Sequence, residues 1–192
     1  MEVTKLINNR GFTALELCIT LALVCILAGL AVTPLQTFVT AQEGDKALRS
    51  IRELVLLARS EAATKGRGVT LCPSSTGNEC GGGTWEAGAL LFLDRNFDRK
   101  INQDDKILRN TRDLSRRGSI TWRAFGNRRY LQIDARGFLR HQSGNFSYCD
   151  ASGDPLLARQ LVVNSAGRLR VAIDSDGDGI RENSRGKALA CE

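Results

Sequence analysis

The sequence contains one histidine among its 192 residues, and it lacks the motifs that mark common catalytic sites. This histidine, His141, lies in a polar Arg-His-Gln-Ser stretch without a recognisable nucleophile partner, which favours a solvated loop residue over a general base. The glycines Gly81–Gly83 are not followed by the Lys-Ser/Thr pair of a phosphate-binding loop. The sequence therefore predicts a protein that is not an enzyme and has no cofactor.

Low-complexity linkers and repeats of fixed period are also absent, which excludes a polar tail and a chain of many domains. Hydrophobic residues make up 42% of the chain, enough for one globular domain with an accessory segment. The formal net charge is +6, so an anionic partner such as nucleic acid, phospholipid or an acidic protein is favoured.

Charged side chains are missing from Leu17 to Gln42, and residues 12–33 are predominantly apolar. A helix over residues 12–33 would be about 33 Å long at about 1.5 Å per residue, enough to cross the hydrocarbon core of a bilayer. Lys5 and Arg10 precede it and are expected to hold the N-terminus on the cytoplasmic side. We therefore expect a transmembrane helix and a single-pass inner-membrane protein with its head in the periplasm. The small residues Ala28–Ala31 leave a cleaved secretory signal as the alternative.

Beyond Pro34 the spacing of apolar residues predicts an amphipathic helix over residues 34–66. Gly66 and Gly68 offer a C-terminal cap. The apolar residues that recur every three or four positions are Ala47, Leu48, Ile51, Leu54, Val55, Ala58 and Ala62. We expect this face to pack against a globular head.

Residues 67–192 contain short β-prone runs separated by clusters of Gly, Asn and Asp. The expected strands are Gly68–Cys72, Gly88–Asp94, Ile107–Arg109, Ser119–Ala124, Tyr130–Asp134, Leu161–Asn164 and Leu169–Ile173. The predicted fold class is therefore α+β. A long N-terminal helix, first transmembrane and then amphipathic, carries a C-terminal head of antiparallel β-sheet or sandwich.

The residues Arg10–Leu17 resemble the signature of type IV prepilins, in which a basic leader ends in Gly and is followed by Phe and Glu before the apolar helix. The resemblance implies that residues 1–11 are a leader peptide, which a prepilin peptidase removes after Gly11. It also implies methylation of the new Phe12 amine, and pairing of Glu16 with the Phe12 ammonium of a neighbouring pilin during filament assembly. The alternative for Glu16 is an interfacial acid that snorkels to water.

Three further stretches, Ala58–Ala62, Val69–Ser74 and Trp85–Asp94, resemble the GspH/FimT family of minor pilins and pseudopilins. The resemblance implies a type IV pilin-like fold, in which a long N-terminal helix carries a β-sandwich-like head. It also implies assembly with other pilins or pseudopilins, in a type IV pilus or in the pseudopilus of a type II secretion system.

Cys18 and Cys25 lie in the predicted membrane helix, where cysteine behaves as a small apolar residue. An oxidising periplasm favours disulfides among the other four. These are Cys72, Cys80, Cys149 and Cys191. Of the three possible pairings we favour Cys72–Cys80, around a short loop, with Cys149–Cys191, which ties down the C-terminus. Zinc is the alternative, but the chain has no C-x-x-C motif and a single histidine.

Two acidic loops have oxygen ligands at spacings near those of an EF-hand calcium site. The first contains Asp94, Asn96, Asp98, Asn102 and Asp105. The second contains Asp174, Asp176, Asp178 and Gly179. Both are incomplete, because Arg99 replaces the turn glycine of the first and Arg185 stands where the second needs a bidentate glutamate. Asp- and Gly-rich connections form turns without metal, so calcium is an alternative here, at the second loop before the first.

All basic side chains between residues 110 and 170, apart from His141, are arginines, and they give this region a net charge of +7. Guanidinium groups present a planar set of donors to phosphate oxygens and stack on bases. An arginine-only excess therefore favours nucleic acid as the anionic partner. A basic surface that only confers solubility is the alternative.

The stretch Gly167-Arg168-Leu169-Arg170 stands at a turn that enters a predicted strand. Alternation places both arginines on one face, with Leu169 inward. The stretch resembles the DNA-binding motif of FimT-type minor pilins, which take up DNA in natural transformation. Four further arginines can extend this surface: Arg128, Arg129, Arg136 and Arg140.

We therefore expect a minor type IV pilin whose head binds DNA through phosphates, without sequence preference. The alternative is a structural minor pseudopilin of a type II secretion system that does not bind DNA.

Overall fold

One helix, α1, runs from Ala14 to Lys65 in the computed structural model. The structure describes residues 12–191, and the side chains of these residues except 30–37. The two helical patterns of the sequence thus form one helix. It ends where Gly66 adopts a left-handed φ of +61°, a conformation that favours glycine and stops the helix.

The chain forms two compact units, Met1–Val39 and Thr40–Glu192. In the first unit, α1 begins with a capping box, because the Glu16 amide donates to Thr13 Oγ1 (3.2 Å) and the Thr13 amide donates to Glu16 Oε2 (3.3 Å). Phe12 is 89% exposed, and the predicted cleavage residue Gly11 lies outside the described residues. Across the part of the chain that is described, no helical segment is both long and apolar enough to span a membrane.

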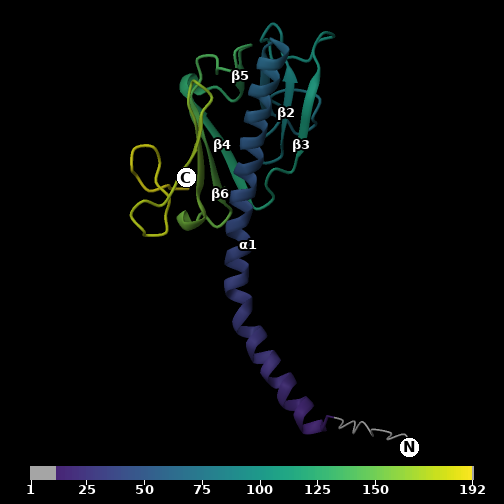
Figure 1. Cartoon of the computed structure of the whole chain (residues 1–192), viewed down its shortest axis with the longest axis vertical. Coiled ribbons are helices and arrows are strands. Elements are labelled where there is room, and N and C mark those ends of the chain that lie inside the picture. The colour runs from purple at the N-terminus through teal and green to yellow at the C-terminus, as the bar shows by residue number, and fades with distance from the viewer. Residues whose placement is uncertain (1–11, 192) are drawn as a thin grey trace, which may run out of the picture. The chain divides into compact units, whose positions relative to one another are not determined.

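The second unit contains two four-stranded antiparallel sheets, with strand orders β3-β2-β1-β5 and β4-β6-β7-β8. The strands are β1 Val69–Pro73, β2 Gly88–Leu93, β3 Ile107–Arg112, β4 Gly118–Ala124, β5 Leu131–Ile133, β6 Gly144–Asp150, β7 Arg159–Val163 and β8 Leu169–Val171. Figure 1 shows β2 and β3 on one side of the second half of α1 and β4 and β6 on the other. The predicted α+β fold class, with an antiparallel head, is confirmed.

The core of the head lies between α1 and both sheets. The apolar face predicted for the second half of α1 is buried in it, and Ile51, Val55 and Ala58 are fully inaccessible. Leu71 of the first sheet and Phe146 of the second belong to the same hydrophobic cluster. Each large aliphatic or aromatic side chain buried in this way contributes about 1.5–3 kcal/mol, so this packing fixes the helix on the sheets.

Strand β6 was not among the expected strands, although it pairs with both β4 and β7. Its sequence, Gly-Asn-Phe-Ser-Tyr-Cys-Asp, is rich in residues that local patterns assign to loops. Phe146 and Tyr148 alternate along it and are fully buried. The Phe146 ring contacts those of Trp85 and Trp122, at centroid distances of 4.9 and 4.4 Å. These tertiary contacts outweigh the weak local preference.

Two disulfides join Cys72 to Cys80 and Cys149 to Cys191, the pairing favoured from the sequence. Cys18 and Cys25 are free and exposed. The Cys149–Cys191 bond connects β6 to the end of the C-terminal segment, drawn in yellow beside β4 and β6 in Figure 1. Ala158, Ala172 and Leu189 form a small separate hydrophobic cluster at this attachment.

Candidate nucleic-acid interface

The hairpin between β7 and β8 turns at Asn164–Gly167. The Gly167 amide donates to the Asn164 carbonyl (2.8 Å), and the Arg168 amide donates to Asn164 Oδ1 (2.8 Å). Gly167 has a φ of +72°, in the left-handed region that side chains with a Cβ rarely adopt. The asparagine side chain and the glycine backbone together close the turn, which fixes the start of β8.

Arg168 and Arg170 project from this hairpin to solvent. Both are exposed while Leu169 between them is half-buried, as strand alternation predicts. The two arginines line one surface hollow of about 380 Å³, together with Val162, Asn164 and Leu169. Neither guanidinium forms an ion pair within the described residues. Their charges are therefore available to an external anion.

Arg59 of α1 holds this turn against a second one. Its Nε donates to the Gly137 carbonyl (3.1 Å) and its Nη1 donates to the Gly167 carbonyl (2.9 Å). A Cβ on Gly167 would lie 2.5 Å from Arg59 Nε, so glycine is also required by the close approach. The partly buried guanidinium of Arg59 thus joins the β7–β8 turn to the loop that follows β5.

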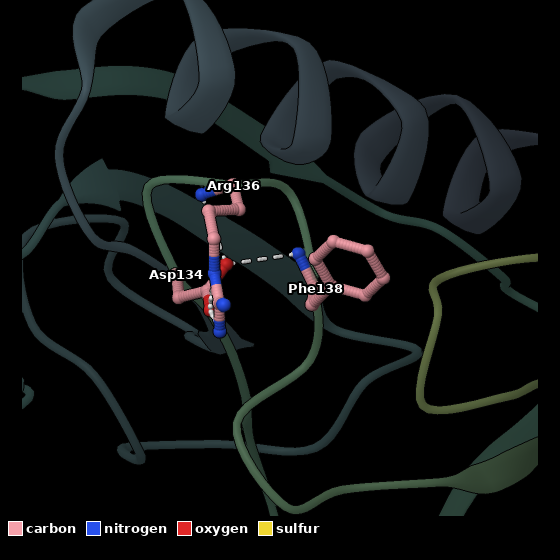
Figure 2. Close-up of polar contacts among 3 residues, drawn as sticks. All are labelled: Asp134, Arg136 and Phe138. Atoms are coloured by element: carbon pink, nitrogen blue, oxygen red, sulfur yellow. Dashed lines mark hydrogen bonds and ion pairs between the residues drawn. The ribbon is translucent and has the colours of Figure 1, made fainter.

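The loop after β5 is organised by Asp134 (Figure 2). Asp134 Oδ1 accepts from the amides of Arg136 (2.9 Å) and Phe138 (3.0 Å), and Oδ2 pairs with Arg136 Nη2 at 2.9 Å. Burial, the largest single influence, raises the pKa of Asp134, but the hydrogen bonds from Arg136 and Phe138 outweigh it and hold the pKa below its usual value. Arg136 is therefore partly neutralised by its own loop.

Arg140 lies near the end of the same loop, and it contacts Arg128, which precedes β5. The Arg140 guanidinium stacks over the Phe97 ring at 3.8 Å, and Arg128 Nη1 donates to the Arg140 carbonyl (3.4 Å). Arg136 and Arg140 line a hollow of about 460 Å³ that also includes Ser165 of the β7–β8 turn. The Leu139 amide donates to the Ser165 carbonyl (3.0 Å), which joins the two arginine-bearing loops directly.

Arg129 lies at a different hollow, of about 600 Å³, which Arg128 shares. Arg99 and Lys100 also line it, and Arg99 stacks over Tyr130 at 4.7 Å. In the sequence, Arg99 stands out only as the residue that replaces the turn glycine of the first acidic loop, and Lys100 carries no signal of a role in binding. Arg99 and Lys100 add positive charge to this hollow because the loop after β2 lies beside Arg128 and Arg129. No local sequence pattern predicts this arrangement.

We refer to the six predicted arginines together as the arginine surface: Arg128, Arg129, Arg136, Arg140, Arg168 and Arg170. Contacts through Arg59, Leu139 and Arg128 connect its loops. His141 has a φ of +51°, is exposed and lines the hollow of Arg136 and Arg140, which adds a residue with hydrogen-bonding capacity to a basic neighbourhood.

In the first acidic loop, the carboxylates accept hydrogen bonds from the loop itself and from neighbouring strands. Asp94 is fully buried and accepts from Thr70 Oγ1 (2.5 Å) and from the amides of Asp98 (3.1 Å) and Arg99 (3.1 Å). A hydrogen bond from Asn102 is the main cause of a lowered pKa of Asp98. These groups satisfy one another, and Asp94 also receives the Gln132 side-chain amide (3.4 Å). The EF-hand-like spacing here is accounted for by a turn.

The second acidic loop differs, because its carboxylates converge. Asp174, Asp176 and Asp178 are exposed, and their carboxylates lie close to that of the buried Glu182, a residue that the sequence pattern did not predict. Backbone hydrogen bonds from Gly177 and Gly179 hold the pKa of Asp174 below its usual value.

Several solved structures resemble this one. One is the type IV minor pilin FimU of Pseudomonas aeruginosa, with a TM-score of 0.52 and 19% identity over 70% of this chain and 91% of that chain. Another is the minor pseudopilin EpsH from the Type 2 Secretion System of Vibrio cholerae, with a TM-score of 0.49 and 12% identity over 67% of this chain and 95% of that chain. No curated protein sequence matches the chain. The likeness to FimU shows a shared fold.

The model of the type II transport protein GspH matches residues 47–167, which include residues 47–65 of α1, strands β1 to β7 and the turn at Gly167. The match takes in more than half of the chain. The protein therefore belongs to the GspH family of minor pilins and pseudopilins, envelope components that assemble with other pilins.

Proposed function

We propose that this minor pilin binds DNA through the arginine surface, without sequence preference, and thereby assists DNA uptake. The observation that carries the proposal is the exposed pair Arg168 and Arg170, which line one hollow and have no ion-pair partner within the described residues. The Gly-Arg-x-Arg stretch also resembles the DNA-binding motif of FimT-type minor pilins.

The geometry suits a phosphate backbone. Residues two apart on a strand lie about 6.6 Å from each other on the same face, so the two guanidinium groups can contact neighbouring phosphates. The turn that carries them is closed by Asn164 and held to α1 by Arg59 (2.9 Å). A fixed turn loses little conformational entropy on binding, which favours the complex.

The test is the affinity of the full chain, in non-ionic detergent, for two double-stranded DNA fragments of unrelated sequence, measured by fluorescence anisotropy over a salt series. Contacts to two or more phosphates predict a log–log salt slope of about −1.8 or steeper, with equal affinity for both sequences. A chain that fails to bind DNA at low salt would exclude the proposal.

The N-terminal part of the proposal concerns membrane insertion and assembly. Residues 12–33 anchor the chain in the inner membrane, the prepilin peptidase cleaves after Gly11, and the Phe12 amine is methylated. Glu16 then pairs with the Phe12 ammonium of the neighbouring subunit. In support, the Glu16 carboxylate lies in the first turn of α1 and accepts hydrogen bonds from Thr13 at 3.3 Å, distances at which a charged partner can compete.

A structural minor pseudopilin of a type II secretion system is the second candidate. The observation in its favour is the family match itself, to the type II transport protein GspH. This candidate predicts co-purification with a secretion pseudopilus and no affinity for DNA, so the anisotropy measurement separates the two functions.

A further inference from the structure

The loop after β8 wraps around the carboxylate of Asp174. Asp174 Oδ1 accepts from the Gly177 amide (2.7 Å) and Oδ2 accepts from the Gly179 amide (2.8 Å). Gly177 and Gly179 have φ values of +83° and +90°, so both turns of the loop require glycine. The loop thereby presents the carboxylates of Asp176 and Asp178 on the same side as Asp174.

Glu182 closes the loop from the protein side. Its side chain is buried, with 8% of the residue exposed. Glu182 Oε2 accepts from the Ser175 amide (2.7 Å) and from Ser175 Oγ (2.6 Å). Glu182 Oε1 is also buried and has no hydrogen-bond partner within the described residues. Burying a carboxylate oxygen without a partner lowers the stability of the fold, so a ligand that contacts Glu182 Oε1 would be stabilising.

The four carboxylates are close enough to share one ion. One oxygen from each of Asp174, Asp176, Asp178 and Glu182 lies within 4.8 Å of the other three. Oxygen ligands of calcium lie about 2.3–2.6 Å from the ion, so two of them are at most about 5 Å apart. The spacing of the four oxygens therefore fits a single calcium ion.

We propose that Asp174, Asp176, Asp178 and Glu182 form a calcium-binding site. Glu182 supplies the fourth carboxylate from the ninth position of the loop, so the arginine at the twelfth position, Arg185, does not prevent binding. A loop built only from carboxylates suits calcium better than magnesium, which retains several waters, and better than zinc, which prefers Cys and His.

Calcium at this site would secure the C-terminal segment on the head. The Glu182 amide donates to the Ile173 carbonyl (3.0 Å), and the Leu189 amide donates to the Arg181 carbonyl (2.8 Å). Arg181 in turn pairs with Asp45 of α1 at 3.2 Å. The ion would remove the repulsion among four carboxylates at the base of this segment, so its binding should raise the melting temperature. This inference is independent of DNA binding.

The test is isothermal titration calorimetry of the full chain in non-ionic detergent with calcium chloride. We expect one ion per chain with a Kd of about 10⁻⁴–10⁻³ M, typical of extracellular calcium modules. At 10 mM calcium the melting temperature should rise by about 5 °C, and a chelator should reverse the rise.

Three variants locate the ion. Glu182→Gln should weaken binding about tenfold or more, because it removes a charged ligand and leaves the side-chain shape. Asp176→Asn tests the same site at an exposed position, where the substitution leaves folding intact. Asp98→Asn in the first acidic loop is the matched control and should bind as the unaltered chain does. The proposal is wrong if the unaltered chain takes up no calcium, if both loop variants retain full affinity, or if Asp98→Asn abolishes binding.

Discussion

Gly167 meets two requirements that other residues do not. It adopts a φ of +72°, and a Cβ at this position would approach Arg59 Nε to 2.5 Å. Gly153 has the same φ of +72°, but nothing lies within 4 Å of its Cβ position. We therefore predict that Gly167→Ala lowers the free energy of unfolding by about 2–3 kcal/mol and Gly153→Ala by about 1 kcal/mol. Urea unfolding measures both, and equal losses would show that the Arg59 contact is dispensable.

Asp134 stabilises the loop of Arg136 and Arg140, and its contribution to the free energy of unfolding depends on pH. Its pKa in the folded chain is lowered, so the stabilisation is present above the unfolded value near 3.9 and is lost as the pH falls through the folded pKa. Asp134→Asn should cost about 1 kcal/mol at pH 7, and the cost should shrink as the pH falls below the unfolded value and through the lowered folded pKa. Urea unfolding of both chains from pH 2.5 to 7 measures this difference. A cost that stays constant with pH would contradict the role of the charge.

Single residues were predictable from the sequence where the pattern was local. The outward position of Arg168 and Arg170 followed from strand alternation, and the structure has both exposed. The hydrogen bonds from Arg59 were not predictable, because their acceptors, the carbonyls of Gly137 and Gly167, are far from Arg59 in the sequence. Glu182 was not predictable from the EF-hand pattern, because that pattern has its glutamate at the twelfth loop position and Glu182 stands at the ninth.

At the scale of elements, α1 was predictable because its apolar face repeats over many turns. All seven expected β-runs coincide with strands, with bounds that differ by a few residues. Strand β6 was not predictable, since only Phe146 and Tyr148 give it an apolar face. Its existence depends on pairing with β4 and β7, which lie on either side of it in the sheet.

The Cys149–Cys191 disulfide attaches the C-terminal segment to strand β6. The two cysteines are 42 residues apart in the sequence. A cross-link over a loop of this length restricts the unfolded chain by about 4 kcal/mol in the loop-entropy description. We predict a loss of this size in the double variant Cys149→Ala with Cys191→Ala, measured by urea unfolding under oxidising conditions. Cys18→Ala with Cys25→Ala is the control; a comparable loss in it, or none in the first pair, would contradict the prediction.

At the scale of the whole molecule, the chain belongs to the GspH family, whose members assemble with other pilins. In the proposed assembly, Glu16 pairs with the amine of a neighbouring subunit. We predict that Glu16→Ala leaves the amount of membrane-inserted protein unchanged and reduces its incorporation into the filament about tenfold or more. Membrane fractionation and co-purification with sheared filaments measure the two quantities. Unchanged incorporation would indicate that Glu16 acts only in the capping box with Thr13.

The arginine surface is a property of the whole fold, because its residues come from separate loops that lie together only in the folded chain. The most direct test is the DNA affinity of the double variant Arg168→Ala with Arg170→Ala at several salt concentrations. The matched control is Arg49→Ala with Arg52→Ala, which removes the same charge from an exposed face of α1. We predict that the first pair weakens binding at least about tenfold and lowers the salt slope by about 1.8, while the control stays near the unaltered chain. Equal losses in both variants, or none in the first, would contradict the account.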